Sequence, residues 1–419
     1  MNPLPSAFLT LPPMGDKSAK TLCKKVRLIA LRELLTVSAA ALGPRADVGM
    51  QRIQAGVQRL VKIDPAGLLD VVGLPDVQVP LLVMAAGLRG PETILPTLVP
   101  SLLSGLALIK GELDEAMLWE HPVEQYAQGG AGRVTIKGGA KAMLLDASGL
   151  AVECIDGSRI DLQGPNGDVG PRIQYALPPT VVQRNGARVE ISLIDSNPLS
   201  MEEAHPDKEG NAITLGGKGM SDWVNALEQS LDLISSALPG WAEEFRYTTQ
   251  RVLPVGFEPE MHLSASYREA PGIVYMTLHP DPLTMAEALI HETQHGKLNL
   301  LSWVDPVLHN AYSAWSESPV RPDLRPIMGV LLAVHAFVPV AALHDRLLQM
   351  DHPISRTPRF EERRQEVLAG NAGGLQLVER IGDPSDLGRR VITGLRAVHD
   401  ELAAGQNVAS WRGDAMPPG

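Results

Sequence analysis

The sequence predicts an α+β protein that is mainly helical, and three observations lead to this fold class. Apolar residues recur at helical spacing from residue 18 to residue 118. Short β-rich runs separated by turn residues follow from about residue 129. Helical patterns return after about residue 219. We therefore expect a helical N-terminal region (1–128), a small antiparallel β-rich middle region or insertion (129–218) and a metal-binding catalytic region (219–419).

The composition is that of a soluble globular protein with two or three domains. The chain has 419 residues, of which 44% are hydrophobic and 20% charged, far from the composition of a disordered chain. The formal net charge is −11, and the aromatic residues are five Phe, six Trp and six Tyr. An acidic chain with few aromatic side chains lacks the basic surface and the stacking platforms of a nucleic-acid binder. Nucleic acid is therefore excluded as the expected partner.

Cysteine usage and hydropathy indicate a cytoplasmic protein. Cys23 and Cys154 lie far apart in apolar neighbourhoods, which excludes a disulfide scaffold and a cysteine-based zinc site. The N-terminus has no basic segment followed by an apolar core, so we do not expect a secretory signal. The longest stretch free of charge and histidine, Thr93–Ile109, is short and contains Pro96 and Pro100. We expect no membrane span.

The elements of the first two regions follow from periodicity and turn residues. A helical stripe begins the first region, and the segments Leu95–Leu98 and Leu102–Leu108 are apolar on nearly every side, which indicates helices buried in a bundle. In the middle region, clusters of Gly, Asn, Asp and Pro separate the expected strands. These strands are Arg133–Ile136, Leu150–Ile155, Arg159–Leu162, Arg172–Tyr175 and Val189–Ile194.

The third region begins with a helix and a hairpin. Apolar residues form one stripe over Asp222–Leu238, which predicts a helix. The runs Met261–Ser266 and Gly272–Leu278 predict the two strands of a hairpin. Thr284 followed by Glu287 is typical of a capping box and predicts a helix to about Trp303. Two further helices are expected, one after Pro326 and one from about Ser385 to Ala404.

The strongest chemical signal is the motif His291-Glu292-Thr293-Gln294-His295. Two histidines four residues apart lie on the same face of a helix, so both imidazoles can bind one metal ion. The structural alternative is a pair of hydrogen-bonded histidines without a metal. Because imidazoles on a buried helix turn are costly unless they have partners, we favour the metal site.

A third ligand decides the class of the site. The metzincin pattern needs Gly and His where Leu298 and Leu301 stand, so that class is excluded. Glu317 is at the spacing of a thermolysin-like ligand, although its segment has the pattern of a loop. His335 is a single histidine in an apolar helix that follows, and as a third imidazole it is our preferred ligand. His262 and His279 flank the expected hairpin and are candidates to line the site.

A proline-rich loop before the second helix offers two cations. Arg321 and Arg325 stand in Arg321-Pro322-Asp323-Leu324-Arg325-Pro326. Two arginines on a stiff loop beside a metal are suited to binding a carboxylate in a bidentate manner. Surface ion pairs on a solvated loop are the alternative. The basic run from Arg356 to Arg364 is interleaved with glutamates, which favours a solvated helix end over an anion site.

These residues resemble a known family. The segments 291–295, 297–301, 318–326, 329–331 and 335–337 are similar to the HExxH-motif peptide-modification proteins. That family includes Fe(II)- and 2-oxoglutarate-dependent hydroxylases of ribosomal peptide biosynthesis (RiPP biosynthesis), which act on precursor peptides. The resemblance covers roughly residues 284–340. Many members have a tryptophan and a histidine where Val320 and Leu332 stand, so any role of that histidine is missing here.

The resemblance implies a dioxygenase that hydroxylates a side chain of a precursor peptide, with Cβ as the expected position. His291, His295 and His335 would hold Fe(II) and leave positions for 2-oxoglutarate and O2. Arg325, with Arg321 behind it, would bind the distal carboxylate of 2-oxoglutarate. Glu292 would then orient a ligand or the substrate.

Two other functions fit the same residues. In a zinc metallopeptidase, Glu292 would be the general base, and His335 or Glu317 the third ligand. Alternatively, the chain is a non-catalytic helical interaction protein with a vestigial or structural histidine cluster. The net charge of −11 favours a peptide partner with a basic or neutral leader.

Overall fold

The structure is a computed structural model that describes residues 10–109, 115–162, 171–202, 204–205, 208–318 and 321–405. The chain forms two compact units. The N-terminal unit comprises Lys24–Thr180 and Glu190–Thr214, and the C-terminal unit comprises Met1–Cys23, Val181–Val189 and Leu215–Gly419. Most of the expected helical region and most of the expected β-rich region thus share one unit. The α+β, mainly helical fold class is confirmed.

The helices of the N-terminal unit follow one another with short breaks. A proline stands in the first turn of α3, α4, α5 and α6, where its fixed φ favours a helix start and its missing N–H costs nothing. The helical elements of this part are α2 (Ser18–Thr36), η1 (Ala40–Leu42), α3 (Pro44–Ile63), α4 (Pro65–Val72), α5 (Pro75–Ala85) and α6 (Pro91–Leu106). They confirm the expected helices, and α6 contains most of the apolar stretch Thr93–Ile109 together with its two prolines.

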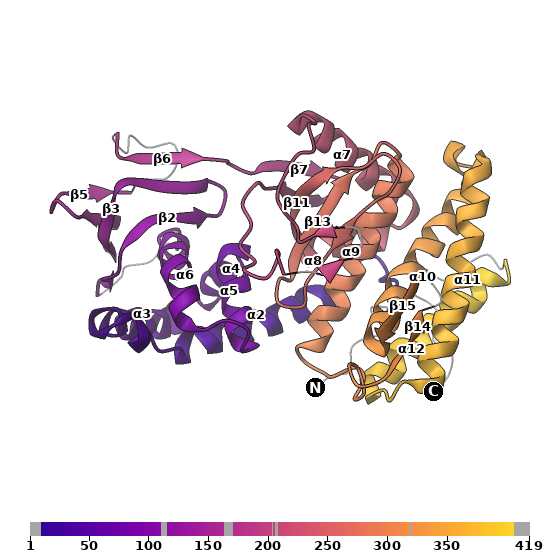
Figure 1. The fold of residues 1–419 in the computed structure, drawn as a ribbon, viewed down its shortest axis with the longest axis horizontal. Coiled ribbons are helices and arrows are strands. Elements are labelled where there is room, and N and C mark those ends of the chain that lie inside the picture. The colour runs from indigo at the N-terminus through magenta and orange to yellow at the C-terminus, as the bar shows by residue number, and fades with distance from the viewer. Residues whose placement is uncertain are drawn as a thin grey trace. The chain divides into compact units, whose positions relative to one another are not determined.

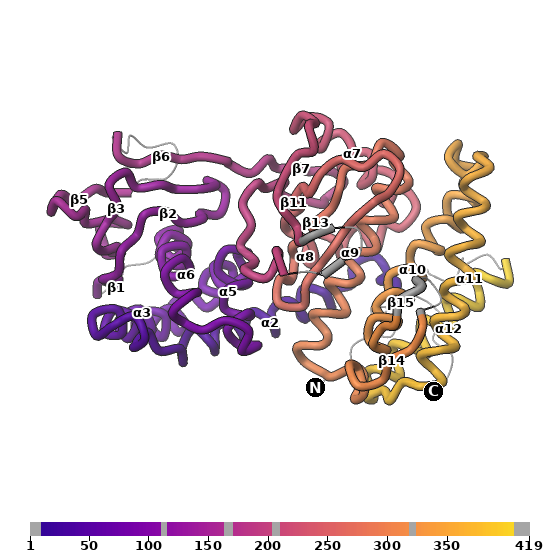
Figure 2. Tube along the Cα trace, viewed as in Figure 1, coloured from indigo at the N-terminus to yellow at the C-terminus, as the bar shows by residue number. Residues whose placement is uncertain are grey.

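An antiparallel sheet completes this unit. Its strands are β1 (Met117–Trp119), β2 (Val123–Gln128), β3 (Gly132–Asp146), β4 (Gly149–Cys154), β5 (Arg159–Asp161) and β6 (Ile173–Ala176). The long strand β3 pairs with β1, β2, β4 and β6, as Figure 2 shows for β2, β3 and β6. Helix α3 packs closely on β1, since a Cβ at Gly49 would lie 2.7 Å from the carbonyl oxygen of Leu118. A short pair, β9 (Ala204–His205) and β10 (Lys208–Glu209), follows.

Two of the sequence predictions for the strands need correction. β1 and β2 lie in the region that we expected to be helical, because their pairing with β3 is tertiary and is not visible in local periodicity. The strand expected at Val189–Ile194 is β8 (Ala187–Ile191), and it joins the sheet of the C-terminal unit instead of the middle sheet. Its neighbour there is β7 (Thr180–Arg184).

The sheet of the C-terminal unit has the order β12-β13-β11-β8-β7. β12 (Ser264–Ala265) and β13 (Gly272–Leu278) form the expected antiparallel hairpin, which is confirmed. β11 (Thr249–Phe257) pairs in parallel with β13, with Val252 opposite Val274, and was not predicted. Every residue of β13 is buried, as expected for a strand covered on both faces.

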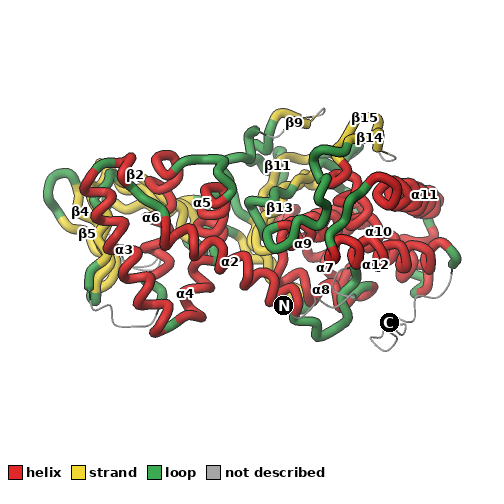
Figure 3. The backbone as a smooth tube through the Cα atoms, turned by 90° about the horizontal axis from the view of Figure 1, so that it is seen from below, coloured by secondary structure: helices red, strands yellow, loops and turns green. Residues whose placement is uncertain are grey.

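Helices surround this sheet. In the chain, α7 (Met220–Ala237) and α8 (Pro239–Thr248) lie between β8 and β11, and α9 (Pro282–Ser302) follows β13. The hairpin of β14 (Trp315–Ser318) and β15 (Arg321–Pro326) leads into α10 (Ile327–Gln349), η2 (Pro353–Arg356), α11 (Pro358–Ile381) and α12 (Asp386–Ala403). Helix α9 packs on β13 and on α10, and α11 and α12 pack on α10 (Figures 1 and 3).

The start of α9 differs from the expected capping box. Asp281 is the N-cap, and its Oδ1 accepts a hydrogen bond of 3.0 Å from the backbone N–H of Leu283. Thr284 donates its hydroxyl to the other oxygen of Asp281 at 3.0 Å. Because Pro282 fixes the first turn directly after an aspartate, the cap forms three residues before Thr284. The capping-box prediction is wrong, and Glu287 is free for contacts with other helices.

One helix of the described residues is apolar and long enough to cross a membrane by itself. It is α10, whose most apolar window has a mean hydropathy of 2.0, and 78% of that window is buried inside the protein. The helices α4 and α5 pass the same test only as a pair bent by 77°. Such burial is typical of the core helix of a soluble protein.

A buried ion pair ties α9 to α8. The Lys297 ammonium lies 3.0 Å from Oε1 and 3.1 Å from Oε2 of Glu244, and both side chains are almost fully buried. Burial lowers the pKa of Lys297 and raises that of Glu244, while each charge favours the ionised form of the other. Removing one partner leaves the other charge buried alone, which is far more costly than replacing both.

We expect Lys297→Met to lower the free energy of unfolding by roughly 3–5 kcal/mol. The double variant Lys297→Met/Glu244→Leu should recover most of this loss, because neither charge then remains buried. Urea unfolding measured by circular dichroism tests both. The control is Arg356→Met, which breaks an exposed pair with Asp351 and should cost less than about 1 kcal/mol. A double variant as unstable as the single one would contradict the assignment.

Candidate metal centre

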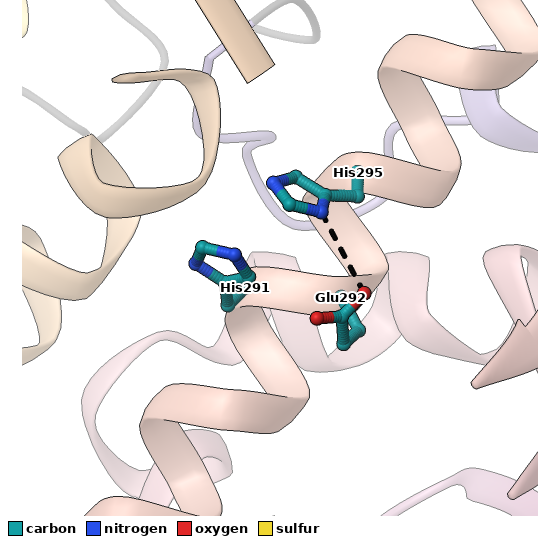
Figure 4. Close-up of side chains that lie close together, drawn as sticks. All are labelled: His291, Glu292 and His295. Atoms are coloured by element: carbon teal, nitrogen blue, oxygen red, sulfur yellow. Dashed lines mark ion pairs between the residues drawn. The ribbon is translucent and has the colours of Figure 1, made fainter. Parts of the chain in front are cut away.

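The middle of α9 brings three potential metal ligands together. One ligand atom from each of His291, Glu292 and His295 lies within 4.8 Å of the other two. The two imidazole rings stand one turn apart on the same face, with centroids 4.1 Å apart (Figure 4). This is the arrangement that the four-residue spacing predicts for a helix.

Glu292 is a buried and well-oriented carboxylate. Only 2% of its surface is exposed, and its Oε1 accepts a hydrogen bond of 2.6 Å from the hydroxyl of Ser264 in strand β12 of the hairpin. Its Oε2 lies 3.6 Å from Nδ1 of His295. Burial alone would raise the pKa of Glu292, but the two histidines and Ser264 outweigh burial and lower it to about 2. The carboxylate is therefore ionised at neutral pH.

The orientation of these groups fits a divalent metal ion. Among the described residues, Nε2 of His295 and Oε2 of Glu292 are buried and have no hydrogen-bond partner. Because Nδ1 of His295 faces Glu292, Nε2 is the nitrogen left for a ligand. Imidazole nitrogens backed by a carboxylate are typical of zinc and non-haem iron sites. His291 and His295 are the residues that would hold the metal.

Helices α10 and α11 form one wall of the site. The ring of Phe337 in α10 packs edge-on against His291, with centroids 4.6 Å apart. The guanidinium of Arg363 in α11 lies over the same phenyl ring, 5.7 Å from its centroid. Arg363 in turn donates its Nε hydrogen to Glu287, one turn before His291, at 3.0 Å. The segment Arg356–Arg364, which we predicted to be a solvated helix end, thus provides an arginine that contacts the phenyl ring packed against His291.

His335 does not join the cluster. Phe337 and His344 both contact α9, and seven residues, almost two turns, separate them. His335 lies two residues before Phe337, about 200° around the helix axis, and therefore on the opposite side of α10. It is completely buried there. The sequence alone indicated the helix of His335 but not its rotation.

The other sequence candidates lie in the β14–β15 hairpin. Glu317 is exposed in β14, opposite Leu324, and is not part of the cluster. Arg321 and Arg325 belong to strand β15, which corrects the expected loop; the side chain of Arg321 is outside the described residues. Arg325 is half-buried just before α10. The helix rises about 15 Å from its start at Ile327 to Phe337, the residue that packs on His291.

Two histidines of the hairpin region, His262 and His279, contact each other, and neither belongs to the group of potential metal ligands among the described residues. Nδ1 of His262 is 3.1 Å from the hydroxyl of Thr277, and its Nε2 is buried without a hydrogen-bond partner among the described residues. His279 accepts the backbone N–H of Asp281 at 3.0 Å, and the two rings meet edge to face at 6.5 Å. Burial lowers the pKa of His262 to about 4, against the charge of Glu292, which raises it.

Sequence reasoning missed the polar network behind the site. Glu287 binds Nε2 of His344 at 2.7 Å as well as Arg363, and so it links α9, α10 and α11. Burial favours neutral Glu287, but these two partners outweigh burial and lower its pKa. The sequence did contain a signal for this network, because Glu287 stands four residues before His291 and therefore on the same face of the helix. We instead interpreted Glu287 as part of a capping box.

Comparisons with known proteins do not identify the chain. No model of a known protein family matches it, and no curated protein is significantly similar to it.

We expect Glu287→Gln to lower the free energy of unfolding by about 3 kcal/mol at pH 7, because Arg363 and buried His344 lose their anion. A carboxylate with a lowered pKa stabilises the folded state above its unfolded pKa of 4.5 and loses this effect as the pH falls. The difference between wild type and variant should therefore shrink from about pH 5 to pH 3. Urea unfolding at several pH values measures it.

The matched control is Glu366→Gln. Glu366 pairs with the same arginine at 3.4 Å but is exposed, so its loss should cost less than about 1 kcal/mol. Equal effects of the two variants would show that Glu287 has no special role.

Proposed function

We propose that this protein is an Fe(II)- and 2-oxoglutarate-dependent hydroxylase that acts on a side chain of a ribosomally synthesised precursor peptide in the cytoplasm. The observation that carries this proposal is the pair of imidazoles from one turn of α9 beside a buried, ionised carboxylate. The resemblance of residues 284–340 to the HExxH-motif peptide-modification proteins supports it. Bound iron would supply the oxidation chemistry with 2-oxoglutarate and O2.

The position of Glu292 suits a positioning role. Its Oε1 accepts a hydrogen bond from the hydroxyl of Ser264, and its Oε2 faces Nδ1 of His295. The carboxylate can therefore hold Nδ1 of His295 in place, which directs Nε2 toward the metal. Glu292 is thus a positioning residue in our proposal.

The alternative is a zinc metallopeptidase in which Glu292 deprotonates water. It uses the same two histidines and the same carboxylate next to them. The two functions differ in what Glu292→Gln does. The glutamine keeps a contact with Ser264 and His295 but is not a base, so a peptidase should lose nearly all activity, whereas the hydroxylase should retain part of it.

Reconstitution under anaerobic conditions tests the main proposal. The protein is loaded with Fe(II), and 2-oxoglutarate and O2 are then added. We expect succinate, formed slowly even without the peptide, and none from the His291→Ala/His295→Ala variant. Absence of succinate together with zinc-dependent cleavage of peptides would overturn the proposal in favour of the peptidase.

The arginines of β15 are our candidates for the distal carboxylate of 2-oxoglutarate. Arg325 stands just before α10 with its side chain half-buried, and Arg321 begins the same strand. We expect Arg325→Leu to raise the KM for 2-oxoglutarate at least about tenfold, since a charge-assisted hydrogen bond contributes about 1.5–3 kcal/mol.

Initial rates of succinate formation measure this effect. The same substitution at Arg321 is the comparison, because it should change the KM less. An unchanged KM in both variants would exclude β15 as the binding element and would leave the metal site unaffected.

A further inference from the structure

Two of the three residues between the histidines of the motif are held by strands of the sheet. Glu292 accepts a hydrogen bond of 2.6 Å from the hydroxyl of Ser264 in β12. The hydroxyl oxygens of Thr293 and of Thr249 in β11 are hydrogen-bonded at 2.9 Å, and both residues are buried. The sheet therefore contacts the motif helix at two successive residues.

The third residue, Gln294, is held by the N-terminal segment of the chain. Its side chain is completely buried, and its Nε2 donates a hydrogen bond of 3.1 Å to the backbone carbonyl oxygen of Thr10. The two residues are 284 positions apart in the sequence. The N-terminal segment thus reaches the residue directly before His295.

The segment that provides this carbonyl, residues 10–16, is packed tightly into the C-terminal unit. A Cβ at Gly240 in α8 would lie 2.1 Å from the carbonyl oxygen of Pro12, so any larger residue there would displace the segment. A Cβ at Gly394 in α12 would lie 2.9 Å from the methyl carbon of Thr10. Helices α8 and α12 therefore fix the position of the carbonyl that Gln294 binds.

The three hydrogen bonds surround α9 on the sides that do not carry the histidines. At about 100° per residue, Glu292 and Gln294 project about 80° to either side of the face that the histidines share. Thr293 projects from the opposite side of the helix. Rotation of α9 about its axis would lengthen at least one of these bonds. Together they determine the direction in which both imidazoles point.

We propose that the N-terminal segment is a structural part of the metal centre, and that Gln294, bonded to Thr10, is a positioning residue for the two histidines. This inference rests on the proposed metal site. Ligand side chains must be held within about 0.5 Å of the productive geometry. Groups that orient ligands commonly change metal affinity by roughly 10–100-fold. Because Gln294 acts through the helix, we expect an effect at the lower end of this range.

Titration of the metal-free protein with Co(II) tests the proposal. The titration gives the Kd, and the visible absorption of bound Co(II) reports the geometry of its ligands. The main variant is Gln294→Met, because methionine has a similar length and volume but cannot donate a hydrogen bond to Thr10. We expect the Kd for Co(II) to rise about tenfold and the intensity of the visible bands to change.

The matched control is Gln54→Met in the N-terminal unit. Nε2 of Gln54 also donates to backbone carbonyls, those of Leu34 at 3.0 Å and Val37 at 2.8 Å. Both variants lose the same kind of interaction, so we expect a lower Tm in both. The Kd for Co(II) should change only in Gln294→Met. Circular dichroism establishes that each variant is folded.

Deletion of residues 1–11 removes the carbonyl itself. If Gln294 acts through Thr10, then Gln294→Met should not change the Kd any further in the shortened protein, because both changes remove the same interaction. Linkage also requires the reverse effect, in which bound metal holds the segment more tightly. Hydrogen exchange of the amides of residues 14–17 should therefore slow when Co(II) is added to the wild type, and less so in Gln294→Met.

The outcomes separate this inference from the metal site on which it rests. An unchanged Kd in folded Gln294→Met, or an effect that adds to that of the deletion, would overturn the inference, while loss of binding in His291→Ala would still support the metal site. If the wild type binds no Co(II), or if His291→Ala and His295→Ala bind it unchanged, the metal site and this inference both fall.

Discussion

The structure of the C-terminal unit depends on the burial of α9 on nearly all of its sides. A helix in this position has no solvent to stabilise polar side chains, and yet α9 carries charged and polar groups in most of its turns. Four of these groups are bonded to a partner from a different element. Glu287 reaches α10 and α11, Glu292 reaches β12, Thr293 contacts β11, and Lys297 pairs with α8. The surrounding elements are thereby fixed around the motif.

Because these polar groups of α9 have partners, the polar atoms of the same helix that lack one stand out. In the described part of the motif, Nε2 of His295, Oε2 of Glu292 and Oε1 of Gln294 are buried without hydrogen-bond partners. Oε2 of Glu292 faces Nδ1 of His295. Nε2 of His295 belongs to the ring that stands beside His291 on one face of α9, where a metal ion would use it. Phe337, held against His291 by Arg363, stiffens the same site from the opposite side.

The parts of the fold that could be predicted from sequence are those determined by local spacing. The stripe of α7, the hairpin of β12 and β13 and the two histidines on one turn of α9 follow from periodicity alone. The position of His335 outside the group of potential ligands could not be predicted in this way, because the rotation of α10 depends on how Phe337 packs on α9. The parallel pairing of β11 with β13 and the partners of Glu287 are tertiary, and the strong cap at Asp281 overrode the weaker pattern at Thr284.

The parallel pairing of β11 and β13 has a consequence for the order in which the site is assembled. Parallel strands cannot be joined by a tight turn, so residues 258–271 must cross from the end of one strand to the start of the next. Ser264 lies on this crossover, and its bond to Glu292 forms only when both strands are in register. The arrangement of the two histidines is local to one helix, whereas the bond that orients Glu292 is a non-local contact. A fragment with α9 alone would therefore carry the two histidines without the bond that orients Glu292.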